Sequence, residues 1–226
     1  MRQVIILGLL LAILFILPFC PTARADVGTD IALVLKVTGQ AQVKKLSPEL
    51  WQEARKGSRL NSGDVVRTRE NTLVAVVFTD DRSMLKIRSN SEVTIRGERQ
   101  KTTIAKRLFM GVGEVWAKVK EGSAFELETP AGVAAVKGTE FYGQVLEDGS
   151  LIVVGIIGFV ELRNALGAIL IGAGKTGTMS KDKTPESKDT QNFYEWAKEL
   201  KIEEELEFEF EDQNGSKEHL KIKFKE

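Results

Sequence analysis

The stretch FELETPAGVAAVKGTEF, residues 125–141, decides the fold of this chain. Its first half alternates phenylalanine or leucine with glutamate, which is typical of a strand with one buried face. Pro130 then ends that strand, because proline has no N–H group to give to a neighbouring strand. Gly132 and Gly138 enclose a run of small apolar residues in which backbones can approach closely. The stretch therefore predicts a strand, a turn and a second strand, with a third strand starting near Phe141.

The first 25 residues predict a secretory signal peptide that is not part of the fold. Arg2 precedes an apolar run from Val4 to Phe19, and the small residues before Asp26 mark a cleavage site after Ala25. We therefore expect a periplasmic or secreted protein.

Two alternatives to cleavage remain open. Cys20 would be the acylated residue of a lipoprotein, although Phe19 is bulkier than that motif favours. An uncleaved segment would be a membrane anchor, although the apolar run is shorter than the about 20 residues that a spanning helix needs.

Composition favours an all-β chain that is held together by burial alone. Cleavage removes the only cysteine, so the mature chain has no disulfide, and its about 200 residues are enough to bury a core. Of the 32 Lys and Arg residues, Arg2 and Arg24 are removed, which leaves 30 against 32 Asp and Glu. These charges are scattered along the chain, so we expect no nucleic-acid partner. The glycines, with abundant Val, Ile, Thr and Phe, are typical of β structure.

Short apolar runs recur about every ten residues, which is the spacing of a sandwich, a barrel or a β-solenoid. Ile31–Val37 and Leu73–Phe78 are examples, and the second predicts a buried strand. Pro48–Lys56 differs, because a serine cap followed by proline predicts one or two turns of helix before Gly57.

The acidic residues between these runs are interpreted as turn residues. Gly63 and Asp64 form a turn in which the carboxylate can bond the local backbone. Asp80 and Asp81 lie between two strands, where adjacent carboxylates point apart and no further oxygen ligand for a cation is near in sequence. The basic stretch 96–107 predicts a solvated face more than a binding patch.

With these residues laid out, the chain resembles the FecR family domain, a periplasmic module. The matching segments are LNSGDVVRT (60–68), FTDDRSMLKIRSNSEVTI (78–95), GEVWAKV (113–119), TPAGVAAVKGTEF (129–141) and DGSLIVVGIIGFVEL (148–162). The resemblance gives a set of motif residues, which we interpret as structural and also as candidate contact residues: Gly63, Asp64, Asp80, Thr129, Pro130, Gly132, Gly138, Thr139 and Phe141. Lys137 stands where the family usually has arginine, and Asp81 where it usually has glycine.

The resemblance implies an exported, non-catalytic module that senses a signal or binds a protein partner in the cell envelope. In the family's sensor proteins a cytoplasmic anti-sigma segment and a membrane helix precede the domain. Only Met1–Gln3 precede the apolar run here, so direct control of a sigma factor is not expected to transfer. The alternative is a structural or adhesion-type envelope component that binds cell wall or polymer.

No catalytic or cofactor site is predicted. Gly172, Gly174 and Gly177 fit a dinucleotide-binding spacing, but the residues after them favour a linker where a phosphate-binding helix would have to begin. We therefore expect no nucleotide. His219 is the only histidine and the mature chain has no cysteine, so we expect neither a metal site nor a Cys/His nucleophile. The chain is predicted not to be an enzyme.

The C-terminal part predicts an appendage to the β domain. We expect the signal peptide at 1–25, an all-β FecR-like domain of short antiparallel strands in a rolled sandwich or β-solenoid at 26–178, a linker at 179–189, and a helix with a β-hairpin at 190–226. Phe193, Trp196 and Leu200 fall on one face of the helix, and Asn214–Gly215 would form the hairpin turn. The hairpin is expected to dock either on its own domain or on a partner.

Overall fold

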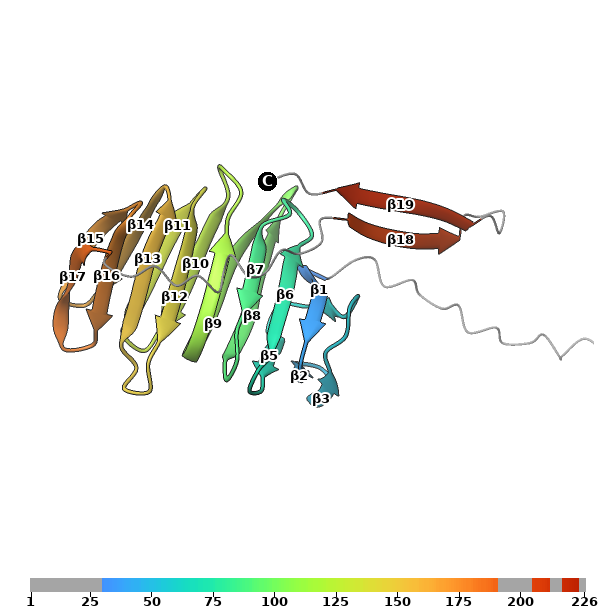
Figure 1. Ribbon diagram of the computed structural model, residues 1–226, viewed down its shortest axis with the longest axis horizontal. Helices are drawn as coiled ribbons and strands as arrows, with labels where there is room; N and C mark the ends of the chain where they lie inside the picture. The colour runs from blue at the N-terminus through green and yellow to red at the C-terminus, as the bar shows by residue number, and fades with distance from the viewer. Residues whose placement is uncertain (1–29, 191–204, 212–216, 224–226) are drawn as a thin grey trace, which may run out of the picture.

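The computed structural model describes residues 30–190 and, for the backbone, residues 205–211 and 217–223. Seventeen strands between Ala32 and Asp189 form one continuous mixed sheet, which bends back on itself as two layers (Figure 1). The all-β prediction is confirmed, because the part of the chain that the structure describes contains no helix.

The two layers share one strand, and no other strand of residues 30–190 pairs with neighbours in both layers. Layer A has the order β1-β6-β7-β9-β12-β13-β16-β17, and β4 also pairs with β1. Layer B has the order β3-β2-β5-β8-β9-β10-β11-β14-β15. The strands of layer A are β1 Ala32–Thr38, β4 Arg59–Leu60, β6 Leu73–Phe78, β7 Met84–Ile87, β12 Glu140–Val145, β13 Leu151–Ile157, β16 Lys175–Ser180 and β17 Lys183–Asp189. Those of layer B are β2 Ala41–Lys45, β3 Leu50–Glu53, β5 Val65–Thr68, β8 Glu92–Gln100, β10 Ala124–Thr129, β11 Gly132–Lys137, β14 Phe159–Asn164 and β15 Gly167–Gly172.

The shared strand is β9, Thr103–Lys118, which is 16 residues long. Its first part pairs with β8 and runs parallel to β10 in layer B, and its last part pairs with β7 and β12 in layer A. Gly113 lies where the strand changes layer and has φ +120°, a conformation that side-chain-bearing residues rarely adopt. A Cβ at Gly113 would stand 2.4 Å from the Cβ of Ser91. The bend therefore requires glycine.

The main core lies between the two layers and takes alternate residues from each strand. In β10, Phe125 and Leu127 are buried in this core, as the alternation of residues 125–128 predicts. The ring of Phe125 meets those of Phe78 and Phe141 edge-on, with centroids 6.3 Å and 6.0 Å away. Such aromatic pairs contribute about 0.5–1.5 kcal/mol beyond the area they bury. The three rings join strands of both layers.

The predicted helix at Pro48–Lys56 is wrong. Leu50–Glu53 instead form the strand β3, which pairs with β2, and the guanidinium of Arg67 lies 4.1 Å from the centre of the Trp51 ring. Backbone pairing along a sheet edge and this cation–π contact outweigh a local capping signal, since helix propensity is a weak preference.

The predicted linker at 179–189 is also wrong, because it contains β17, which pairs with β16 at the end of layer A. The polar composition that favoured a linker suits an edge strand, which has one side open to solvent. Pro185 lies where the register between the two strands shifts, so its missing N–H breaks no regular ladder.

The C-terminal hairpin is confirmed, whereas the predicted helix around Phe193–Leu200 lies outside the described residues. Strands β18 Glu205–Glu211 and β19 Lys217–Lys223 pair antiparallel in a separate two-stranded sheet. Glu207 is opposite Lys221 and Leu206 is opposite Ile222 in the register. The turn predicted at Asn214–Gly215 lies outside the described residues.

Alanine substitutions at two glycines separate the cost of backbone strain from the cost of crowding at the bend of β9. Gly57 also has a positive φ, +84°, but a Cβ there would meet nothing within 4 Å. We expect Gly57→Ala to cost about 1 kcal/mol of unfolding free energy, and Gly113→Ala a further ~1–3 kcal/mol because the neighbouring backbone must move. Urea unfolding of both variants measures the difference, and equal losses would contradict the role of Gly113.

Candidate interaction surface

The hairpin of β10 and β11 accounts for the first half of the motif at residues 129–141. Thr129 is buried and its hydroxyl donates to the carbonyl oxygen of Gly132 at 3.0 Å, which closes the turn around the exposed Pro130. Gly132 has φ +145°, and a Cβ there would stand 2.4 Å from the carbonyl oxygen of Arg163. These residues therefore let β11 approach β14 closely.

The second half of the motif carries the chain from layer B to layer A. Gly138 has φ +68°, and the buried Thr139 donates from its hydroxyl to the carbonyl oxygen of Phe159 at 2.9 Å. The carbonyl of Thr139 accepts from the N–H of Val119 at 2.9 Å. Phe141 then enters the main core. The motif residues from 129 to 141 thus shape the backbone, and Pro130 is the one that is exposed.

Gly63 and Asp64 belong to a turn at the other end of layer B. The carboxylate of Asp64, whose side chain is buried, accepts from the N–H groups of Asn61 at 2.8 Å and Leu46 at 3.2 Å and from Lys45 Nζ at 2.6 Å. This agrees with the predicted turn in which the carboxylate bonds the local backbone. The structure does not bring Asp64 together with the motif residues at 129–141 on one surface.

Asp80 belongs to a buried charge cluster that the sequence interpretation missed. Lys106, with no exposed side-chain surface, donates from Nζ to Asp80 at 2.9 Å, to Asp81 at 2.6 Å and to the carbonyl oxygen of Ile104 at 3.2 Å. Asp80 also accepts from the N–H of Ile104 at 2.7 Å, while its Oδ1 is buried with no hydrogen-bond partner among the described residues. Through these contacts the cluster connects the β6–β7 turn of layer A to the start of β9.

The basic stretch 96–107 is therefore not a uniform solvated face. Lys106 lies between Ile104 and Leu108, and all three side chains are on the buried side of β9. This alternation in the sequence is the signal from which an inward position of Lys106 could have been predicted. A lysine that is buried in this way requires charged partners.

Asp81 is held ionised by its hydrogen bonds. Burial alone would raise the pKa of Asp81, but hydrogen bonds from Lys106, Ser123 and Ser83 together hold that pKa below its ordinary value. The carboxylate therefore contributes stability that is present above pH about 4 and is lost as the pH falls through the lowered pKa.

The outward face of layer B carries a ladder of alternating charges. Arg107 Nε lies 3.2 Å from Glu126 and 3.3 Å from Glu128, and Arg163 lies 2.8 Å from Glu126. Arg96 reaches Glu128 at 3.4 Å, so the ladder extends from β8 to β14. The arginines are about half exposed, and exposed pairs of this kind contribute only ~0–1 kcal/mol each.

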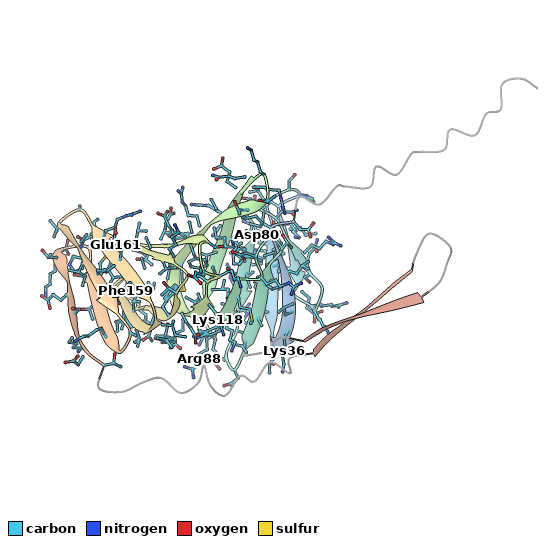
Figure 2. The ribbon with its side chains drawn as sticks, turned by 90° about the horizontal axis from the view of Figure 1, so that it is seen from above. Lys36, Asp80, Arg88, Lys118, Phe159 and Glu161 are labelled. Atoms are coloured by element: carbon cyan, nitrogen blue, oxygen red, sulfur yellow. The ribbon has the colours of Figure 1, made fainter. Side chains whose placement is uncertain are left out.

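Two large apolar side chains stand beside this ladder. Phe159 and Leu170 are each 63% exposed, on neighbouring strands β14 and β15. The Phe159 ring lies over Gly172, where a Cβ would come within 3.3 Å of it, and Leu170 is opposite Glu161 in the register. Figure 2 shows Phe159 and Glu161 at the same end of the molecule. Exposed apolar residues that are grouped beside charges are typical of a protein-binding surface.

The described residues also line a cavity, in which the charged side chains of Arg88 and Glu114 pair with each other. This cavity of about 370 Å³ is lined by Arg88, Glu114 and Gln144, but Glu114 already accepts from Arg88 at 2.8 Å and from Gln144 at 3.1 Å. His, Cys, Asp and Glu side chains within the described ranges form no group of three that could hold a metal ion. Within those same ranges no helix has the length and apolar character that crossing a membrane requires.

The central part of the chain matches a known protein family. Residues 64–160 match the family model described as FecR protein. These residues form a FecR domain. The match begins at Asp64, just before β5, and ends at Val160 in β14, so it includes the charge cluster of Lys106 and the motif at 129–141. The flanking strands β1–β4 and β15–β17 belong to the same continuous sheet as the FecR domain.

Solved structures give a weaker likeness. Two crystal structures of an anti-sigma factor candidate from Parabacteroides distasonis, at 1.65 Å and 2.50 Å resolution, each align with a TM-score of 0.48 and 15% identity. Each alignment covers 55% of this chain and 59% of the other, so this chain spans less than two thirds of that protein's length. A comparison with curated proteins finds no match.

The contribution of the charge cluster to stability can be tested by measuring the unfolding free energy of variants as a function of pH. We expect Lys106→Met, which leaves the buried carboxylate of Asp80 and the partly buried one of Asp81 without their cation, to cost about 3–5 kcal/mol at pH 7. Asp81→Asn removes one charged hydrogen-bond acceptor and is expected to cost about 1.5–3 kcal/mol at pH 7. Because the pKa of Asp81 is lowered, the deficit of Asp81→Asn relative to the wild type should shrink as the pH falls below about 4.

Urea unfolding at a series of pH values measures both effects. Asp148→Asn is the matched control, since this carboxylate lies in an exposed turn. A deficit of Asp81→Asn that stays constant from neutral to acidic pH would contradict the assignment.

Proposed function

We propose that this chain is an exported, non-catalytic module that senses a signal or binds a protein partner in the cell envelope. The observation that carries the proposal is the FecR domain at residues 64–160, which supports a sensing or regulatory role. The arginine- and glutamate-rich ladder of layer B and the exposed pair Phe159 and Leu170 supply a surface for such a partner.

The partner surface is the outward face of β14 and β15. Phe159 and Leu170 offer an apolar centre, and Glu161 and Arg163 on the same face offer charges of both signs around it. An apolar centre within a polar rim is the usual arrangement of a protein–protein contact. A protein partner with an apolar side chain flanked by opposite charges fits this surface.

Site-specific photo-cross-linking in whole cells tests the surface. A photoreactive residue replaces Phe159 in one variant and Leu50 in a matched control, because Leu50 is also an exposed apolar residue, 54% exposed, but lies on β3 at the far end of layer B. We expect a discrete protein adduct from position 159 that is lost with Leu170→Ser, and none from position 50. Adducts with cell-wall polymer from both positions would instead support the structural or adhesion-type alternative.

The N-terminal residue of the purified protein tests export with cleavage. We expect Asp26 as the first residue, because the small residues at 23–25 form the predicted cleavage site. N-terminal sequencing or intact mass measures it. A mature protein that starts at Met1 would contradict cleavage and support a retained anchor, and a mass that indicates an acylated Cys20 would support a lipoprotein.

A further inference from the structure

Layer A carries clusters of apolar residues on both of its faces. All six residues of β6 are buried; Val74, Val76 and Phe78 belong to the core between the layers, whereas the alternate residues of the strand belong to separate clusters. A strand that is buried on both faces lies in the middle of three layers. The outward residues of layer A that form these clusters are Leu33, Leu35, Leu73, Ala75, Val77, Met84, Trp116, Tyr142, Val154 and Ile156.

These outward residues form a continuous row across the strands. Trp116 on β9 is opposite Tyr142 on β12, and Tyr142 is opposite Val154 on β13. Their exposed fractions are 6%, 2% and 2%. On the other side Trp116 is opposite Lys86 on β7, and the Nζ of this buried lysine lies 4.2 Å from the centre of the indole ring. We call the apolar outward residues that form the two separate clusters the outer row of layer A.

The outer row is covered, yet the strands of residues 30–190 form two layers and provide no third one over it. Layer B lies on the opposite side of layer A, against the main core. In Figure 2, Lys36 and Arg88 lie toward the side of the molecule away from Asp80 and Glu161. The cover of the outer row must therefore come from outside these strands.

We propose that residues 191–204 of the same chain dock across the outer row. The segment starts where layer A ends, because β17 at its edge finishes at Asp189, and the chain is next described at Glu205. Extended residues reach about 3.3 Å each, so 191–204 can span roughly 46 Å. The seven steps between the eight strands of layer A measure roughly 34 Å at about 4.8 Å each. The segment is long enough to cross the whole layer.

Its composition suits the outer row as well. Phe193, Trp196, Leu200 and Ile202 supply apolar side chains, and the glutamates of 191–204 outnumber its lysines. The outward face of layer A carries the exposed Lys36 and Lys118, which form no ion pair with another described residue. Apolar burial would hold the segment, and its acidic residues would lie near these lysines. The proposal is independent of the partner that the outward face of layer B binds.

Cysteine cross-linking in the full chain tests the proposal. Cys20→Ser removes the only native thiol. Ala197→Cys is then combined either with Ile156→Cys, on the outer row, or with Ala135→Cys, on the outward face of layer B, as the matched control. A short bis-maleimide should join the first pair within one molecule at least roughly tenfold more efficiently than the control pair, as an opening free energy of 1.4 kcal/mol or more would give.

The outcomes are distinct on denaturing gels and by mass. Intramolecular linkage that is specific to position 156 supports the proposal. Covalent dimers from the same pair would overturn it in favour of a second copy as the cover, and equal or no linkage at positions 156 and 135 would overturn it outright.

A second measurement does not depend on cross-linking geometry. In a chain with Cys20→Ser and Ile156→Cys, the added variant Trp196→Asp should raise the rate of thiol labelling at position 156 by at least roughly tenfold, since a buried charge disfavours docking. Lys198→Ala is the control and should leave the rate nearly unchanged. Because position 196 lies outside the seventeen-stranded sheet, the core should remain folded. A labelling rate that Trp196→Asp does not change would overturn the proposal.

Discussion

The participation of β9 in both layers is the constraint on which the rest of the structure depends. A 16-residue strand whose two parts pair with different neighbours cannot stay flat, because each layer must turn its own apolar face toward the common core. The backbone changes direction at Gly113, and later crossings between layers include those at Gly138 and Gly158, both with positive φ. The crossings at Gly138 and Gly158 lie against each other, since a Cβ at Gly158 would come within 3.2 Å of the Gly138 carbonyl oxygen. Glycines therefore set where the chain changes layer.

The two kinds of charge in this molecule have different consequences. The Lys106 cluster is buried and joins the two layers at the start of β9, so loss of one partner leaves an uncompensated charge in a site of low dielectric constant. The ladder of layer B is exposed, and each of its pairs contributes little to stability. Substitutions in the cluster thus act on folding, whereas substitutions in the ladder are free to change what the surface binds.

The sequence was most informative where backbone geometry leaves little choice. The strand–turn–strand at 125–141 was predictable because its alternation, its proline and its glycines all favour the same structure. The helix at Pro48–Lys56 and the linker at 179–189 were wrong because β3 and β17 are sheet edges, whose pairing depends on distant strands. Lys106 was missed for a similar reason, since its partners Asp80 and Asp81 are 25 residues or more away in the chain. Of the candidate site, the motif residues were found from the sequence, but the exposed pair Phe159 and Leu170 required the register of β14 and β15.

The outward faces of the two layers differ in a way that favours layer B as the surface for the proposed partner. The apolar outward face of layer A is already buried, so a partner that bound there would first have to displace its cover, at a cost that grows with the apolar area exposed. The outward face of layer B exposes Phe159 and Leu170 without any such cost, and its charge ladder can orient an approaching protein. Both faces belong to one sheet, because β9 pairs with strands of both layers. The proposed partner surface and the buried outward residues of layer A therefore lie on different layers of the same sheet.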